Sequence, residues 1–322
     1  MVLSFVKKNH PLILFTAPIL AVIPFLITIN YDHIFSGQLT TNVFLWFAGL
    51  FDSIAYAWII VPYGLIIAVF FLLVKMNSRY IFIESRTFLD GIVFLFLALS
   101  LFPLRVLNPA HISGIFLMLT FFSLFRLEKE TNIRVAFDTG FILSAGSLFH
   151  WQLIYYLIPV WIAFSVIKTM SFREYLVSLA GIIVPYMFYF FWFFWNDDIQ
   201  GFVILMKQQN IFDFSIPVLN LRETIYFSSL VLFFLICLLA SMSSMKAKKI
   251  IRRKYFTIFF ILVFYSFILC MVRNFDTSFI IISLPWLSVL LANFFILSKS
   301  RFFTELVFTI MAGVSLYNIF TW

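Results

Sequence analysis

Long runs of apolar residues, separated by short polar segments, follow one another along the whole chain. About 20 apolar residues in a row cross the hydrocarbon core of a membrane as a helix. The runs are continuous rather than alternating, which favours helices over a membrane barrel. The pattern predicts an all-α integral membrane protein, with residues 1–322 forming one polytopic domain of about 11 transmembrane helices. The predicted spans are 11–29, 54–74, 88–107, 111–126, 135–149, 152–167, 174–195, 225–244, 255–272, 278–297 and 302–321.

The amino-acid composition also indicates that lipid surrounds most of this chain. Hydrophobic residues make up 63% of it and charged residues 11%, whereas an ordinary globular domain is about 25% charged. A chain with so few charges cannot cover a water-facing surface, because it has too little polar surface to do so. No segment between the apolar runs is long enough for an independent soluble domain.

The basic residues indicate how the chain is oriented. Of the 22 lysines and arginines, all but four lie on the side of the predicted spans that also holds residues 1–10. Cytoplasmic loops are enriched in Lys and Arg, so we expect a cytoplasmic N-terminus and a periplasmic C-terminus. The four on the other side are Arg105, Lys207, Arg222 and Arg273.

The densest group of cations lies in the loop 245–254, which contains the run KAKKIIRRK. In a cytoplasmic loop such a run orients the chain against anionic lipid, where each cation contributes about 1 kcal/mol. No aromatic interleaving or nucleic-acid-binding module accompanies it, so we expect no nucleic-acid partner. A cytoplasmic protein partner for the run stays open as an alternative.

Two outer segments are predicted to lie on the membrane surface. The outer loop 196–224 contains the patch FVILM, which is typical of an interfacial helix. The segment 43–53, VFLWFAGLFDS, has the same character between the first two spans.

Three polar side chains at the predicted outer ends of spans are candidate ligands for a lipid phosphate or another substrate: Arg105, His111 and His150. An arginine facing outward can bind a phosphate through its planar guanidinium. The alternatives are that Arg105 extends to the interface to reach water, and that His150 belongs to an aromatic anchor with Trp151.

Three carboxylates near the inner ends of spans follow an arginine by four residues. This spacing places both side chains on one helix face, which predicts ion pairs within each helix. A role in proton or ion coupling is the alternative, since charges at membrane depth are rare without a function. The pairs are Arg86 with Asp90, Arg134 with Asp138, and Arg301 with Glu305.

No motif in the chain names a reaction. The histidines and carboxylates form no metal-ligand spacing, and Cys237 and Cys270 lie in apolar runs as packing residues. No phosphate-binding glycine loop or dinucleotide fingerprint is present. We therefore expect no metal and no cofactor.

Residues 108–198 nevertheless resemble a known family. The likeness is carried by NPAHISGIFLML with the turn RLEKETNIR, by FDTGFILSAGSLFHWQLIYYLIPVWIAF, and by SFREYLVSLAGIIVPYMFYFFWFFWND. Together these segments resemble a family of polytopic inner-membrane proteins of Bacteroidota that is known only as a domain of unknown function. The resemblance implies the inner membrane of a Gram-negative bacterium.

The same hairpin, small-residue helix and aromatic helix are distantly similar to the C class of polyprenyl-phosphate-sugar glycosyltransferases. Those enzymes place a catalytic Asp or Glu in the first outer loop. The matching positions are Asp32, in NYDHIFSG, and Asp52, in LFDS, and the paired acidic motif usual in that class is absent. The resemblance implies Asp32 or Asp52 as general base, a polyprenyl-phosphate-linked sugar as substrate and membrane lipids as partners.

Three functions follow from these observations. The first is an enzyme or binding protein for a lipid-linked sugar of the cell envelope. The second is a non-catalytic subunit of an inner-membrane assembly, with another membrane protein as its partner. The third is a transporter or flippase, which would need broken helices and polar groups at mid-membrane depth.

Overall fold

The computed structural model describes most of the chain. The described residues are 11–27, 41–51, 53–54, 56–83, 87–100, 105–128, 133–168, 171–208, 221–244, 249–272, 277–298 and 300–321. Every regular element within these ranges is a helix, so the all-α prediction is confirmed for the described part of the chain.

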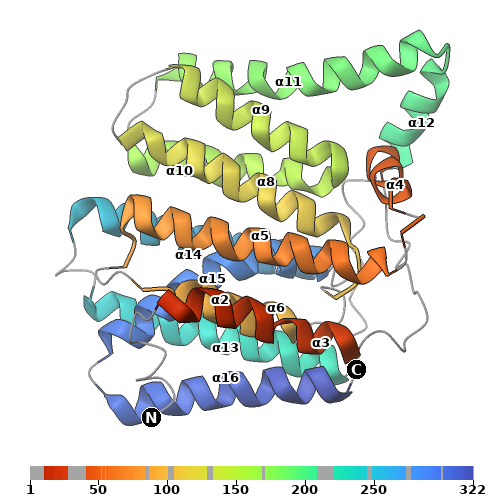
Figure 1. The fold of residues 1–322 in the computed structure, drawn as a ribbon. Coiled ribbons are helices and arrows are strands. Elements are labelled where there is room, and N and C mark those ends of the chain that lie inside the picture. The colour runs from red at the N-terminus through yellow and green to blue at the C-terminus, as the bar shows by residue number, and fades with distance from the viewer. Residues whose placement is uncertain are drawn as a thin grey trace.

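Most of the longer helices lie side by side with their long axes in roughly one direction (Figure 1). In chain order they are α2 (Pro11–Leu20), α3 (Val22–Ile27), α4 (Asn42–Gly49), α5 (Ala57–Tyr80), α6 (Leu89–Leu99), α8 (Pro109–Leu124), the 3-10 helix η2 (Phe125–Glu128), α9 (Ile133–Phe149), the 3-10 helix η3 (Trp151–Tyr156), α10 (Leu157–Ile167), α11 (Phe172–Trp195), α12 (Ile199–Gln208), α13 (Leu221–Ser244), α14 (Ile250–Val272), α15 (Thr277–Leu297) and α16 (Arg301–Thr321).

Seven helical segments in the described chain are long and apolar enough to cross a membrane. They are Ala57–Tyr80, Pro109–Glu128, Phe172–Trp195, Glu223–Ser241, Ile250–Val272, Ser278–Leu297 and Arg301–Ile319. The chain is thus a candidate multi-pass membrane protein. Shorter helices occupy the other four predicted ranges, so the count of about 11 and the orientation of the termini stay predictions.

The centre of the bundle is α15, which is almost entirely buried. It packs against α14, α6, α8 and α13. Its Trp286 is the largest fully buried side chain, stacked on Phe259 of α14 at 5.5 Å between ring centroids and edge-on to Phe121 of α8 at 5.1 Å. Aromatic pairs of this geometry add about 0.5–1.5 kcal/mol each beyond the area they bury. The heavy use of phenylalanine therefore serves packing between helices as well as contact with lipid.

The described part of the basic loop joins three helices at one end of the bundle. Lys254 Nζ donates a hydrogen bond to Ile167 O at the end of α10, at 2.6 Å. The next residue, Tyr255, donates its hydroxyl proton to the Glu128 carboxylate in η2. Residues 245–248 lie outside the described chain. The end of the basic run thus ties α14 to α10 and to the turn between α8 and α9.

Helices are present at both segments predicted to lie on the membrane surface. α12 falls within the loop 196–224, and α4 falls within 43–53. Both lie at the same end of the bundle, on the right of Figure 1.

Candidate functional site

The predicted site residues divide into two groups. Asp32 and Asp52, the candidate bases, lie outside the described residues. Arg105, His111 and His150 are described, and at most 3% of each side chain is exposed. The three lie around the start of α8, the end of α9 and the chain that leads into α8.

The local sequence NPAH fixes the start of α8. Asn108 is the N-cap residue, and its side-chain oxygen accepts from the Ala110 backbone N–H at 2.8 Å. Pro109 follows at the first helical position, where a missing N–H costs nothing. His111 Nδ1 lies 3.0 Å from Asn108 O. A carbonyl can only accept, so Nδ1 carries the proton and the ring is held against the first turn.

A serine joins this turn to the end of α9. Ser113 Oγ lies 3.1 Å from Ala110 O and 3.4 Å from His150 Nδ1. When the hydroxyl donates to the carbonyl, His150 Nδ1–H is the donor to Ser113. The structure therefore brings the two predicted histidines to one buried layer, through Ser113.

Arg105 serves the end of another helix. Its Nε donates to Leu99 O, the last residue of α6, at 3.0 Å. The carbonyls at a helix C-terminus lack partners within the helix and carry the negative end of its dipole. The guanidinium is 1% exposed, so Arg105 is a buried cap on α6, a contact that sequence reasoning did not predict.

α4 contacts the end of α9 and the start of α8. Thr41, its N-cap, accepts from Phe44 N at 3.3 Å and donates to Phe149 O at 2.9 Å. Phe44 is fully buried and packs with Leu107 and Ile112. One polar bond and one small apolar cluster thus hold α4 in place.

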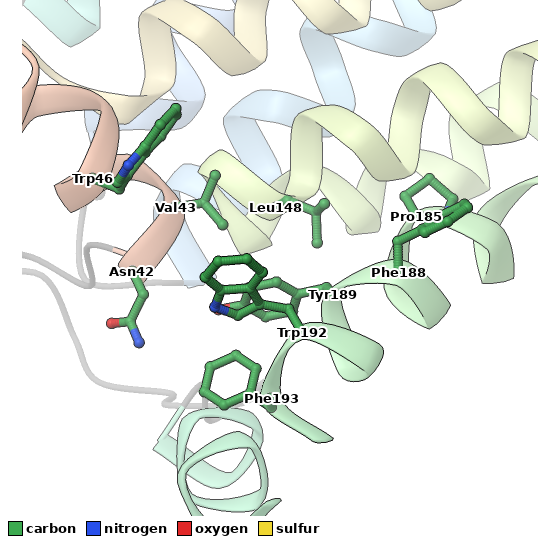
Figure 2. A pocket seen from close by; sticks show the side chains of 9 residues that line it. All are labelled: Asn42, Val43, Trp46, Leu148, Pro185, Phe188, Tyr189, Trp192 and Phe193. Atoms are coloured by element: carbon green, nitrogen blue, oxygen red, sulfur yellow. The ribbon is translucent and has the colours of Figure 1, made fainter. Parts of the chain in front are cut away.

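Beside α4 runs a groove with a cavity volume of about 700 Å³. Figure 2 shows α4 residues on one side of it and α11 residues on the other. Its lining is mostly apolar and aromatic, and the polar groups in it come from Asn42, Tyr189 and two indoles. The lining residues are Asn42, Val43, Trp46, Leu148, Pro185, Phe188, Tyr189, Trp192 and Phe193.

A small polar corner lies where α9 and α11 meet. Tyr186 of α11 and Ser147 of α9 are hydrogen-bonded through their hydroxyls at 2.5 Å, and the Trp151 ring packs edge-on to Tyr186 at 5.6 Å. Trp151 Nε1 and Gln152 Oε1 are buried without a hydrogen-bond partner among the described residues. Leu148, which lines the groove, precedes His150 by two residues along the chain.

The groove residues were not singled out from the sequence as a site. Two signals were present: the aromatic run YFFWFFW at the end of the seventh span, and the segment VFLWFAG. What the sequence could not give is their proximity, because α4 and the end of α11 are about 140 residues apart.

In the described chain, no three His, Cys, Asp or Glu side chains gather in a way that could hold a metal ion. Comparisons with protein-family models, with curated proteins and with solved structures find no match for this chain. Any assignment of function therefore depends on the geometry of the candidate site. The site offers an aromatic groove that suits an apolar chain and, around the start of α8 and the end of α9, buried arginine and imidazole side chains.

Proposed function

We propose that this protein binds a polyprenyl-phosphate-linked lipid at the outer face of a bacterial inner membrane, and acts on the sugar that the lipid carries. One observation supports this most: α4 lines an aromatic groove of about 700 Å³, and its N-cap Thr41 bonds to Phe149 O, the residue before the buried His150. An isoprenoid chain is apolar and suits a groove lined by ring faces. Its phosphate suits a guanidinium, which binds phosphate oxygens in a bidentate manner.

The headgroup must displace protein to reach Arg105, His111 and His150, because each is at most 3% exposed. α4, which contacts the end of α9 and Ile112 of α8, is the nearest small element that could move. α4 is held by the Thr41–Phe149 bond and by the packing of Phe44. A hydrogen bond contributes about 0.5–1.5 kcal/mol net. An anion that pairs with Arg105 can offset a cost of this size, so binding accompanied by a shift of α4 is energetically reasonable.

Binding is tested with the full-length chain in nanodiscs, using native mass spectrometry to count bound lipid. Three lipids separate the contributions: polyprenyl phosphate, polyprenol without phosphate, and phosphatidic acid without an isoprenoid chain. We expect polyprenyl phosphate to be retained in preference to both others. Equal retention of phosphatidic acid would contradict recognition of the isoprenoid chain, and equal retention of polyprenol would contradict recognition of the phosphate.

A matched pair of tryptophans tests the groove itself. Trp192 lines it, whereas Trp195, one turn further along α11, does not; the two side chains are similarly exposed, at 68% and 76%, so they differ mainly in their position relative to the groove. Burying a large apolar side chain is worth about 1.5–3 kcal/mol. Trp192→Ala should therefore weaken the binding of polyprenyl phosphate roughly tenfold or more. Trp195→Ala should leave the affinity nearly unchanged. Equal effects would remove the groove from the proposal.

Catalysis is a separate question, which the two outer aspartates address. In the resemblance to the C-class glycosyltransferases, Asp32 or Asp52 acts as general base. We expect Asp32→Asn or Asp52→Asn to keep lipid binding and thermal stability but to lose transfer of the sugar. Unchanged envelope glycans in both variants and in a deletion strain would contradict sugar transfer. Lipid binding would then be the function that remains.

A second function is favoured by one feature of α11. This helix packs mainly on α9 and on α12 and exposes a row of large aromatic side chains, among them Phe188, Phe191 and Trp195. Such a face suits a neighbouring membrane protein as well as lipid, so the second function we propose is a non-catalytic subunit of an inner-membrane assembly. A stoichiometric partner after purification in mild detergent would support this function, and a clean monomer would contradict it.

A further inference from the structure

Asp90 is the most isolated ionisable group in the described chain. It lies in the first turn of α6, and none of its surface is exposed. Neither carboxyl oxygen has a hydrogen-bond partner among the described residues. The backbone N–H groups of Asp90 and Gly91 lie near the carboxyl, in a geometry short of a hydrogen bond.

The packing around Asp90 is tight and apolar. At the next residue, Gly91, an added Cβ would lie 2.6 Å from a ring carbon of Phe70 and 3.3 Å from Val74, both on α5. α6 also packs against α15, α16 and α2. The close approach of α5 excludes water beside the carboxyl on that side.

The helices around α6 offer little charge to Asp90. α2 (Pro11–Leu20) and α15 (Thr277–Leu297) contain no titratable side chain. On α5, the Arg79 guanidinium lies 4.8 Å from the ring centroid of Phe122, on α8. Arg86, the partner that the sequence suggests, lies outside the described residues. The titratable and charged groups on α5 and α16 are Tyr63, Lys75, Arg79, Tyr80, Arg301, Glu305 and Tyr317.

Energies decide which form of the carboxyl this site can hold. An ionised carboxyl that is buried without a partner loses more hydration energy than the dipole at a helix N-terminus returns. A bound metal cation would need several oxygen ligands, and no three His, Cys, Asp or Glu side chains in the described chain gather so that they could hold one. A protonated, neutral carboxyl needs neither a charged partner nor a metal.

We therefore propose that Asp90 is a proton-binding site within the helical core. Its carboxyl holds a proton while α5, α6 and α15 are packed together, and releases it when these helices separate far enough to admit water. The ligand is the proton alone. This inference does not depend on the lipid site at the outer ends of α8 and α9.

Infrared spectroscopy reads the protonation state directly, because the C=O stretch of a protonated carboxyl is separate from the bands of a carboxylate. The full-length protein is labelled with ¹³C in its aspartate carboxyls and placed in nanodiscs at neutral pH. We expect one protonated aspartate per chain. No such signal in the unmodified protein would overturn the proposal, and would instead agree with an ion pair between Asp90 and Arg86.

Variants assign the signal to its residue. Asp90→Asn should abolish it, and Asp138→Asn should not, because the Asp138 carboxylate is partly exposed and lies 3.6 Å from Arg126. Asp90→Leu replaces the asparagine variant if that variant does not fold. A signal that persists in a folded Asp90 variant overturns the proposal. So does a wild-type signal that disappears at the pH where exposed aspartates ionise, and this last measurement needs no variant.

Discussion

The crossing of α9 and α11 gives the sharpest prediction, because two glycines allow the two backbones to touch. A Cβ added at Gly140 of α9 would lie 2.0 Å from Ser178 O of α11, and one added at Gly181 of α11 would lie 2.4 Å from Phe137 O of α9. Real Cβ atoms essentially never approach a heavy atom within 3.0 Å, so Gly140→Ala must open the crossing by about 1 Å.

The cost of that opening exceeds what alanine gains. Overpacking a well-packed contact costs about 1–3 kcal/mol, while alanine gains about 1 kcal/mol over glycine as a helix former. The obstacle at Gly140 is backbone, which cannot move aside as a flexible side chain does. We therefore expect Gly140→Ala to lower the unfolding free energy by about 1–2 kcal/mol. It should also weaken polyprenyl phosphate binding, because α11 forms one wall of the groove.

Gly114→Ala is the matched control. Gly114 is also buried within a helix, α8, but an added Cβ there meets no heavy atom within 4 Å. This variant should be as stable as the unmodified protein or more stable. The stability of both variants is measured by unfolding them in mixed micelles with increasing amounts of a denaturing detergent. Circular dichroism monitors the unfolding. The reasoning is refuted if the two variants shift stability in the same direction or if Gly140→Ala is unchanged.

Three further changes test contacts at the two ends of the bundle. Tyr255→Phe removes the hydrogen bond to the Glu128 carboxylate and should cost about 1.5–3 kcal/mol in the same unfolding assay. Thr41→Val removes the cap of α4 and its bond to Phe149 O, so backbone amides in α4 should exchange hydrogen faster, by roughly fivefold for a loss of about 1 kcal/mol. Arg105→Met leaves a buried carbonyl at the end of α6 without its donor and should cost about 1–3 kcal/mol.

Each of these three variants has a control variant that should have a smaller effect or none. Tyr56 is 59% exposed, so Tyr56→Phe should leave stability unchanged. The Thr309 hydroxyl bonds only carbonyls of its own helix in the described structure, so Thr309→Val should not alter exchange in α4. Arg105→Lys keeps the charge but replaces the planar fork with a single ammonium, so it should restore part of the loss. Equal effects within any pair would show that the named contact is not the cause.

The helices themselves could be predicted because their signal is local. Each apolar run specifies a helix whatever its neighbours are, and a helix lies within every predicted range. The surface segments 43–53 and 196–224 were recognisable in the same way, and α4 and α12 lie there. Whether these two helices lie in the membrane interface stays a prediction.

The candidate site could be predicted only in part, because its contacts join distant segments. His111 and His150 were chosen for their position at outer span ends; His111 contacts Asn108 O at the start of α8, and His150 reaches Ser113 of the same helix. Arg105 was expected near the interface, but the point at which α6 ends decides its contact with Leu99 O. Asp138 forms an ion pair with Arg126, in the turn before its own helix. No rule of local spacing indicates such a partner.

The shortness of α6 accounts for the positions of Asp90 and Arg105. Its 11 residues span about 16 Å, roughly half of the hydrocarbon core. Both helix ends would therefore lie at membrane depth, where exposed backbone groups cannot be tolerated in lipid. Protein must surround them, and α5, α15 and α16 do so. The Arg105 guanidinium then satisfies the C-terminal carbonyl at Leu99, while Asp90 stands in the N-terminal turn, where the helix dipole favours an acidic group. The same cover that makes a half-length helix possible removes water from Asp90, and Arg105 lies where the chain leads from α6 to α8, so the surroundings of both residues follow from where one short helix begins and ends.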